Sequence, residues 1–482
     1  MLQGQKEIFR MKTSWIATIV LITVLGLGAA YAAGAPLFVG FSVGLLALGG
    51  AALRSGTADR ASLWGMMRDG VGHTKEVVWI LLLVGLLIPA WTASGVIANL
   101  VDAGLSLLHP AWIVSFGFFF SAAFAMAVGT STGTLSAVGI PLIGIAAHLG
   151  VPLPLMAGAL VSGAFVGDRT SPFSSAHQLV ASSVGVPERS LYRLLQPTTY
   201  ASVLIALLAF AAFDWFGPWG AAEGGAGSGP TAVASTGGAG GGFADSRLLW
   251  APPALLLVCN LFRLRTKYAF AATIVAAVII GVYVQGGSLQ DWTSWLWHGY
   301  APVEPAASAA SGSGADASHG KGLVGMIDLI LLIVLAGAYN GIMEKGGIVR
   351  PVAERLLGTG TSLFGATART GLFGLALGLV SCTQTLPIMM TGRSLAAVWV
   401  ERFPRAELAR VTADTSLLLA ALVPWNLIAV LCSTILGVPA EAYLPFALFL
   451  WVPPLLTLAL SARRDRSSRK LAAGTSEHQK RA

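Results

Sequence analysis

Five long stretches of this chain are almost free of charged residues, and no other feature limits its fold as strongly. They cover residues 15–33, 77–100, 200–213, 269–284 and 444–460. Each approaches or exceeds the roughly 17–25 apolar residues that a helix needs to cross a bilayer. Backbone groups in lipid have no water to bond, so spanning segments must be helices or closed barrels. Barrel strands alternate polar and apolar residues, whereas these runs are continuously apolar. The chain is therefore predicted to be an all-α integral membrane protein.

The composition excludes several other classes of protein. Hydrophobic residues make up 55% of the chain and charged residues only 11%, against about 45–50% and about 25% in soluble domains. The net charge is +8, but the basic residues are scattered over short loops and the C-terminal tail, which indicates membrane orientation rather than nucleic-acid binding. No phosphate-binding loop and no His/Cys cluster occurs, so the sequence predicts a secondary transporter without a cofactor, and not an enzyme.

Positive residues flank the apolar segments at both ends of the chain. Lys6, Arg10 and Lys12 precede the first segment, and a basic tail over 462–482 follows the last. Because positive loops stay in the cytoplasm, both termini are expected there, with the chain in the inner membrane of a bacterial cell. Two stretches rich in Gly, Ala and Ser, 217–245 and 286–320, contain no Lys or Arg and are expected to be flexible outside loops.

Two parts of the chain repeat the same order of features. In each, an apolar run leads to a hydroxyl-rich turn and then to an acid inside an apolar helix, Asp168 or Asp414. The loop charges are opposite at equivalent points: residues 99–110 carry no Lys or Arg, whereas their counterpart carries Lys345 and Arg350. The two halves are therefore predicted to be inverted across the membrane, as in many secondary transporters. Helix breaks are expected at Trp91, Ser94, Tyr339 and Asn340.

The predicted organisation has five parts. These are N-terminal helices and a cytoplasmic loop over 1–75, a first repeat over 76–217, a central insert with two helices and outside loops over 218–322, a second repeat over 323–461, and the tail over 462–482. Each repeat should hold a hairpin, at 111–149 and 362–400, and a broken helix, at 154–185 and 411–436. The charge pattern fits two re-entrant hairpins with about ten full spans, and a full double crossing by each hairpin satisfies it equally.

Asp168 is the first candidate for ion chemistry, because it lies inside a predicted span. An isolated acid at mid-bilayer costs about 2.5–3.5 kcal/mol on insertion scales. Pro172 weakens the helix just after it. Freed carbonyl oxygens, the carboxylate and the hydroxyls of Thr170 and Ser171 would together suit a hard cation such as Na⁺. The structural alternatives are a helix cap or an ion pair with the neighbouring Arg169.

Asp414 is the second candidate and occupies the equivalent place in the second half. Pro424 should break this helix too, leaving Asn426 near the centre, and Thr415 adds a hydroxyl. The structural alternative is that Asp414 lies near the cytoplasmic end and pairs with Arg410 one turn earlier.

Hydroxyls and amides at the two hairpin turns could supply further cation ligands, although small polar residues also serve helix packing in membranes. These candidates are Thr130, Ser131, Thr383 and Gln384. Arg393 could pair with an acid or bind a substrate carboxylate, and extension to the cytoplasmic surface is the favoured interpretation. His177 could relay protons, although a structural polar contact is favoured for it.

Two groups of motifs resemble the NhaC family of Na⁺/H⁺ antiporters. The first comprises Gly129-Thr-Ser-Thr-Gly-Thr134 and residues 157–174, and the second Leu422-Val-Pro-Trp-Asn426 and residues 436–446. The resemblance runs from about Gly70 to Pro454 and keeps the order of the motifs. It implies membership of a superfamily of ion transporters with inverted repeats and hairpins. Members of the family include Na⁺/H⁺ exchangers and antiporters that couple malate uptake to lactate and Na⁺.

The chain departs from the family pattern at three motifs. Thr132 stands where the family has tryptophan, Ser174-Ser-Ala-His-Gln178 replaces Ser-Asp-Thr-Thr-Asn, and Ala413-Asp-Thr-Ser-Leu417 replaces Glu-Asp-Ser-Gly-Thr. One acid in each half is kept and a second is lost.

The expected function is exchange of Na⁺ or Li⁺ for H⁺ by alternating access, with cation and proton competing for Asp168 and Asp414. The alternative is an ion-coupled antiporter of small organic acids or amino acids, with Arg393 holding the substrate carboxylate. An enzyme or scaffold would not need duplicated broken helices. The expected partners are a monovalent cation, protons and membrane lipid, with no nucleic acid and no resident metal. The sequence leaves the oligomeric state open, a homodimer included.

Overall fold

The computed structural model describes residues 13–55, 58–107, 109–217, 246–262, 264–286, 288–300, 322–346, 355–356 and 362–481. Within these residues all regular structure is helical, which confirms the all-α prediction. Eight described helices are long and apolar enough to cross a membrane, or nine if the bent pair Leu427–Leu436 and Ala440–Phe446 is one span. Three shorter apolar helices accompany them. Three of the eight long helices, Pro110–Val128, Ser131–His148 and Leu363–Ser381, are arms of the predicted hairpins, which the prediction counted apart from the full spans.

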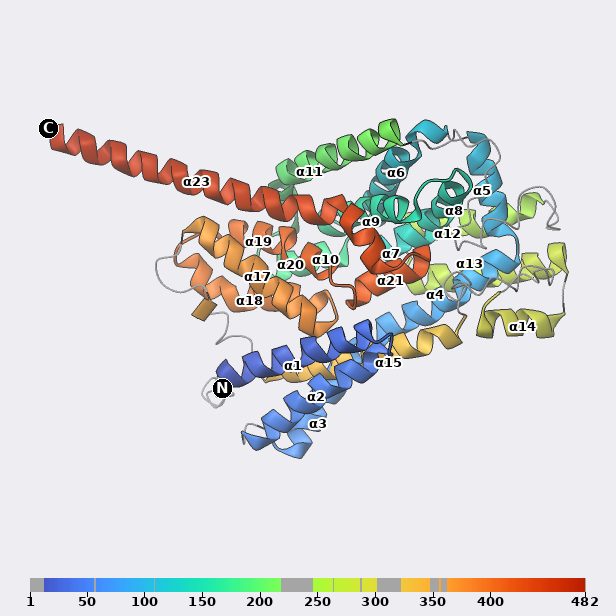
Figure 1. Ribbon diagram of the computed structural model, residues 1–482, viewed down its shortest axis with the longest axis horizontal. Coiled ribbons are helices and arrows are strands. Elements are labelled where there is room, and N and C mark those ends of the chain that lie inside the picture. Colours follow the sequence, from blue (N-terminus) through green and yellow to red (C-terminus); the bar gives the residue numbers. More distant parts are fainter. Residues whose placement is uncertain are drawn as a thin grey trace.

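The N-terminal helices pack against a helix from the far side of the central insert. These N-terminal helices are α1 (Thr13–Ala32), α2 (Leu37–Arg54) and α3 (Arg60–His73), and they are followed by α4 (Lys75–Ala93) and α5 (Val96–Leu107), which begin the predicted first repeat. Figure 1 shows α1, α2 and α3 lying together with α15 (Ile327–Lys345) along one side of the molecule. Glycines make this contact close: a Cβ on Gly70 of α3 would lie 2.8 Å from the Cα of Gly341 on α15.

The first repeat contains the predicted hairpin and the predicted broken helix. Its elements are η1 (Pro110–Trp112), α6 (Ile113–Val128), α7 (Ser131–Thr134), the π-helical turn η2 (Leu135–Gly139), α8 (Ile140–His148), α9 (Leu153–Thr170), α10 (Ser175–Val184) and α11 (Glu188–Phe216). The hairpin turns at Gly129, whose φ is 81°. Both of its arms, Pro110–Val128 and Ser131–His148, are long enough to cross a membrane.

Residues 362–481, which include most of the predicted second repeat, have a comparable order of elements. They are α17 (Leu363–Ser381), α18 (Thr385–Val400), α19 (Arg405–Asp414), α20 (Ser416–Ala420), α21 (Leu427–Leu436), α22 (Ala440–Tyr443), η6 (Leu444–Phe446) and α23 (Leu448–Arg481). The predicted break near Pro424 is present between α20 and α21, and the helix is also interrupted at Thr415. The long α23 leaves the bundle and carries the C-terminus away from it (Figure 1).

In both repeats the first arm of the hairpin packs closely on the broken helix. A Cβ on Gly163 of α9 would lie 2.8 Å from the backbone nitrogen of Ala122 on α6. In the second repeat a Cβ on Gly374 of α17 would lie 2.8 Å from the Cβ of Ser416 on α20. Small residues let helix backbones approach in membranes, and here they hold each hairpin against the helix that carries the acid.

The central insert corrects one prediction. Its elements are η3 (Arg247–Trp250), α12 (Ala251–Leu261), α13 (Thr266–Gln285), α14 (Leu289–His298) and η5 (Val324–Met326). The helices predicted near 247–261 and 269–285 are present, but α14 lies inside a stretch predicted to be a flexible loop. A capping box between Ser288 and Asp291 starts this helix, and Trp292 packs against Gly281 of α13. Residues 218–245 and 301–321 of the predicted loops lie outside the described residues.

The expected helix breaks differ between the halves. In the first half α4 ends at Ala93 and α5 begins at Val96, as predicted from Trp91 and Ser94. In the second half the prediction is wrong, because α15 runs without a break to Lys345. Tyr339 there is fully buried and packs on the ring of Phe41, with ring centroids 5.4 Å apart. Tight packing of α15 on α2 and α3 stabilises a regular helix at this point.

Candidate functional site

Asp168 lies in the last turn of α9 and faces the tip of the first hairpin. Its Oδ1 accepts a hydrogen bond from the backbone N–H of Ser131 at 2.9 Å, and its Oδ2 accepts one from the Ser131 hydroxyl at 2.6 Å. The residue is only 7% exposed. None of the ion pairs formed by the described residues involves Asp168. This buried carboxylate is therefore held by neutral donors alone.

Local sequence builds this arrangement from two helix interruptions. Ser171 takes an extended conformation after α9, and its hydroxyl donates to the carbonyl of Met126 on α6 at 2.9 Å. The hydroxyl of Ser174 donates to the backbone carbonyl of Asp168 at 2.7 Å and also caps α10. On the hairpin side, the Thr130 side chain caps α7 by accepting from Gly133 N–H at 3.1 Å. The break in α9 and the hairpin tip thus contact each other.

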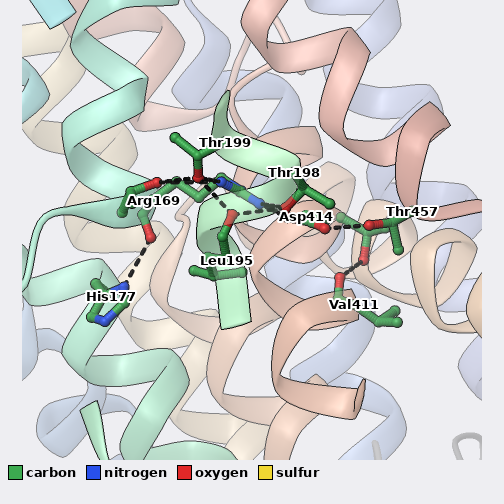
Figure 2. Close-up of polar contacts among 10 residues, drawn as sticks. Arg169, His177, Leu195, Thr198, Thr199, Val411, Asp414 and Thr457 are labelled. Carbon is green, nitrogen blue, oxygen red and sulfur yellow. Dashed lines mark hydrogen bonds and ion pairs between the residues drawn. The ribbon is translucent and has the colours of Figure 1, made fainter. Parts of the chain in front are cut away.

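Asp414 lies in a different cluster, where it forms a buried ion pair with Arg169 (Figure 2). The Nε of Arg169 donates to Asp414 Oδ1 at 2.7 Å, and Nη2 donates to the same oxygen. The hydroxyl of Thr457 on α23 donates to Oδ2. Both side chains of the ion pair have no exposed surface. The pair joins α9 of the first repeat to α19 of the second.

The remaining donors of Arg169 are directed at threonines. Nη1 donates to Thr170 at 3.2 Å and to Thr199, and Nη2 donates to Thr198, the last two lying on α11. The ring of His177 contacts the Arg169 carbonyl at 2.9 Å, as Figure 2 shows. Sequence reasoning missed Thr198, Thr199 and Thr457. A detectable signal for the first two is a pair of hydroxyls directly after Pro197, where the apolar part of α11 begins.

The tip of the second hairpin contacts the broken helix of its own repeat. The side-chain amide of Gln384 donates to the Leu417 carbonyl at 2.9 Å, and that of Asn426 donates to Gly378 at 3.3 Å. The amide of Asn340 donates to the Thr383 hydroxyl at 3.1 Å. Asn426 also caps α21 through its Oδ1. These candidates form polar contacts with one another and with neighbouring backbone, and neither Asp168 nor Asp414 takes part in these hydrogen bonds.

Four further residues that were proposed for the site from the sequence form hydrogen bonds or an ion pair within the protein. Thr170 faces Arg169, and the Thr415 hydroxyl donates to Val411 of its own helix at 2.6 Å. His177 makes a polar contact, as favoured from the sequence. Arg393 has a side chain that is 59% exposed and lies 3.8 Å from a carboxylate oxygen of Glu344, so it pairs with an acid, one of the alternatives considered from the sequence.

Two ion pairs were considered from the sequence, Asp168 with Arg169 and Asp414 with Arg410, and neither is present among the described residues. Arg169 pairs with Asp414 rather than with its neighbour Asp168. Arg410 pairs with Glu407, which also pairs with Arg464 of α23. Helix geometry explains the first result, because consecutive side chains on a helix point in different directions.

Comparisons with known proteins agree with this architecture. The model of the Na⁺/H⁺ antiporter family matches residues 231–462. The Na⁺/H⁺ antiporter NhaC of Bacillus subtilis is 28% identical over 81% of this chain and 85% of its own length. The NhaC of Alkalihalophilus pseudofirmus is 26% identical over 86% and 87%. The malate-2H⁺/Na⁺-lactate antiporter of Bacillus subtilis is 26% identical over 78% and 79%.

The helices long and apolar enough to cross a membrane and these matches indicate a multi-pass membrane transporter of the antiporter class. The chain is similar over most of its length to the Na⁺/H⁺ antiporters NhaC of these two organisms.

Proposed function

We propose that this chain exchanges Na⁺ or Li⁺ for H⁺ by alternating access, with Asp168 as the group that carries either the proton or the cation. The observation that carries the proposal is a buried carboxylate, at a helix break, whose direct partners are neutral. Burying an ionised carboxylate without a counter-charge is costly. A bound proton or a bound cation removes that cost, so the two compete for one site.

The surroundings of Asp168 supply the oxygen atoms that a hard cation prefers. Besides the carboxylate, the hydroxyl of Ser131 lies 2.6 Å away. The hairpin tip and the helix break meet at this point, so a change in their separation would open or close the site. Binding of a cation at the carboxylate would draw the Ser131 oxygen toward it as a second ligand. Protonation would remove the charge that holds the cation and favour its release.

Exchange in proteoliposomes tests this proposal. A Na⁺ or Li⁺ gradient should drive a pH change that a dye inside the vesicles reports, and Asp168→Asn should abolish the change. Asp69→Asn is the matched control, because Asp69 is an exposed acid on α3 and should leave exchange unchanged. The proposal is wrong if the wild-type protein gives no cation-dependent pH change, or if Asp168→Asn exchanges at the wild-type rate.

Antiport of small organic acids is the second candidate. It is favoured by the similarity to a protein named as a malate-2H⁺/Na⁺-lactate antiporter. An organic carboxylate needs a cationic partner within the site. Arg393 is largely exposed, and the five N–H groups of Arg169 already have partners. These contacts make organic acids the weaker candidate. Uptake of labelled malate or lactate that needs no Na⁺ would reverse this order.

We also propose that the two repeats, 76–217 and 323–461, are inverted in the membrane with both termini in the cytoplasm. Their elements follow a comparable order, and in each a glycine contact joins the hairpin to the broken helix. Labelling of single cysteines from either side of the membrane tests this topology. Placement of residues 99–110 and Lys345 on the same side would contradict it.

A further inference from the structure

The acids at equivalent places in the two repeats have different electrostatic surroundings. Asp168 accepts its side-chain hydrogen bonds from Ser131 alone, which carries no charge. Asp414 accepts two hydrogen bonds from the guanidinium of Arg169 and one from Thr457. One acid thus needs a mobile positive charge to become neutral, and the other already has a fixed one.

The positive charge beside Asp414 is permanent. An arginine side chain offers five N–H donors and stays protonated in proteins. All five donors of Arg169 are used, two on Asp414 and one each on Thr170, Thr198 and Thr199. Both partners of the pair are fully buried. Separating them would leave an uncompensated charge in the protein interior, which costs several kcal/mol.

The other buried acids that the structure describes have ion-pair or hydrogen-bond partners. Glu407 pairs with Arg410 and with Arg464. Asp214 at the end of α11 accepts from the backbone N–H groups of Val114 and Ser115, where it caps α6. Asp168 likewise accepts a backbone N–H, that of Ser131 at the start of α7. Among the buried acids that the structure describes, Asp168 and Asp214 therefore lack a cationic partner, and of these two Asp168 is the one that lies at a helix break against a hairpin tip.

We propose that Arg169 is the built-in counter-cation of the second repeat, so that one transport cycle exchanges one monovalent cation for one proton and moves no net charge. This inference rests on the exchange proposed above and adds its stoichiometry. Asp168 is neutral with either a proton or a cation bound, and the Arg169–Asp414 pair is neutral throughout. Each crossing of the loaded protein then carries the same charge in both directions.

The membrane potential is the variable that tests this stoichiometry. Wild-type protein is reconstituted into vesicles, and K⁺ with valinomycin sets the membrane potential. At a fixed pH gradient, the measured quantity is the null gradient, which is the Na⁺ gradient at which no net proton flux occurs. One-for-one exchange predicts the same null gradient at every potential. Exchange of two protons for one Na⁺ would shift the null gradient tenfold for every ~59 mV, and such a shift overturns the inference. Absence of any Na⁺-dependent proton flux instead overturns the proposed antiport itself.

Neutral substitution of the pair provides a second test. The double variant Arg169→Gln/Asp414→Asn removes both charges and leaves Asp168 in place, so it should retain exchange with a null gradient independent of potential. Arg68→Gln, on the exposed face of α3, is the matched control. A double variant that remains folded by gel filtration but loses exchange would show that Asp414 takes part in the ion chemistry, and would overturn the inference.

Discussion

Arg169 and Asp414 lie 245 positions apart in the sequence and form an ion pair with no exposed surface, linking α9 to α19. Their contact ties the broken helices of the two repeats together. Thr198 and Thr199 on α11 and Thr457 on α23 complete the cluster, so it joins four helices. A fully hydrogen-bonded pair of this kind is costly to break by removing one partner.

The first prediction concerns the stability of this pair. Arg169→Gln and Asp414→Asn should each destabilise the protein by about 3–5 kcal/mol, because each leaves the other charge buried and alone. The double variant should lose much less than the sum of the two. Thermal unfolding of all four proteins in detergent completes a double-mutant cycle and gives the coupling. Additive losses would mean that the two side chains do not depend on each other.

The second prediction concerns Ser131, whose hydroxyl donates to the Asp168 carboxylate. The same hydroxyl oxygen is the proposed second ligand of the cation. Ser131→Ala should therefore raise the half-saturating Na⁺ concentration, by roughly tenfold for a loss of about 1.4 kcal/mol of binding free energy, measured from proton flux at varied Na⁺. Ser106→Ala is the control, because its hydroxyl bonds only within its own helix. An unchanged Na⁺ dependence in Ser131→Ala would remove this hydroxyl from the site.

The sequence was sufficient to predict the helical architecture, the hairpin turns and the breaks beside Pro172 and Pro424. These features depend on local properties, namely apolar length, glycine at a turn and proline in a helix. The break expected at Asn340 was wrong, because close packing with neighbouring helices stabilises a regular α15 there. The helix α14 was missed since its length of 10 residues is too short for a span and its flanks are rich in small residues.

Within the candidate site, the burial of Asp168 beside a helix break could be predicted, but the partner of Asp414 could not. An acid in an apolar segment is visible from composition alone. The partner depends on how helices far apart in the sequence pack, and only near neighbours were considered from the sequence, Arg169 for Asp168 and Arg410 for Asp414. Which arginine reaches Asp414 is decided by the packing of α9, α11, α19 and α23.

The third prediction concerns the turn of the first hairpin. Gly129 has a φ of 81°, and a Cβ there would lie 2.7 Å from the backbone carbon of Phe173, next to the break in α9. Gly129→Ala should therefore lower both thermal stability and exchange. Gly150→Ala is a matched control, because Gly150 has a φ of 69° but open space around its Cβ position. The control should show only the conformational cost of about 1–2 kcal/mol. Equal losses in the two variants would exclude a role for the contact with Phe173.

The fourth prediction concerns the exposed ion pair between Asp69 on α3 and Lys345 on α15. The hydrogen bond from Lys345 lowers the pKa of Asp69 below its ordinary value of 3.8. A lowered pKa in the folded state stabilises the protein above the ordinary value, and this contribution is lost as pH falls through the lowered value. Asp69→Asn should thus lower the melting temperature slightly near pH 7 and not at all at pH values below the lowered pKa. Because the pair faces solvent, added salt should reduce the difference at pH 7. Melting curves of both proteins at two pH values and two salt concentrations measure this, and a difference that grows with salt would contradict an electrostatic origin.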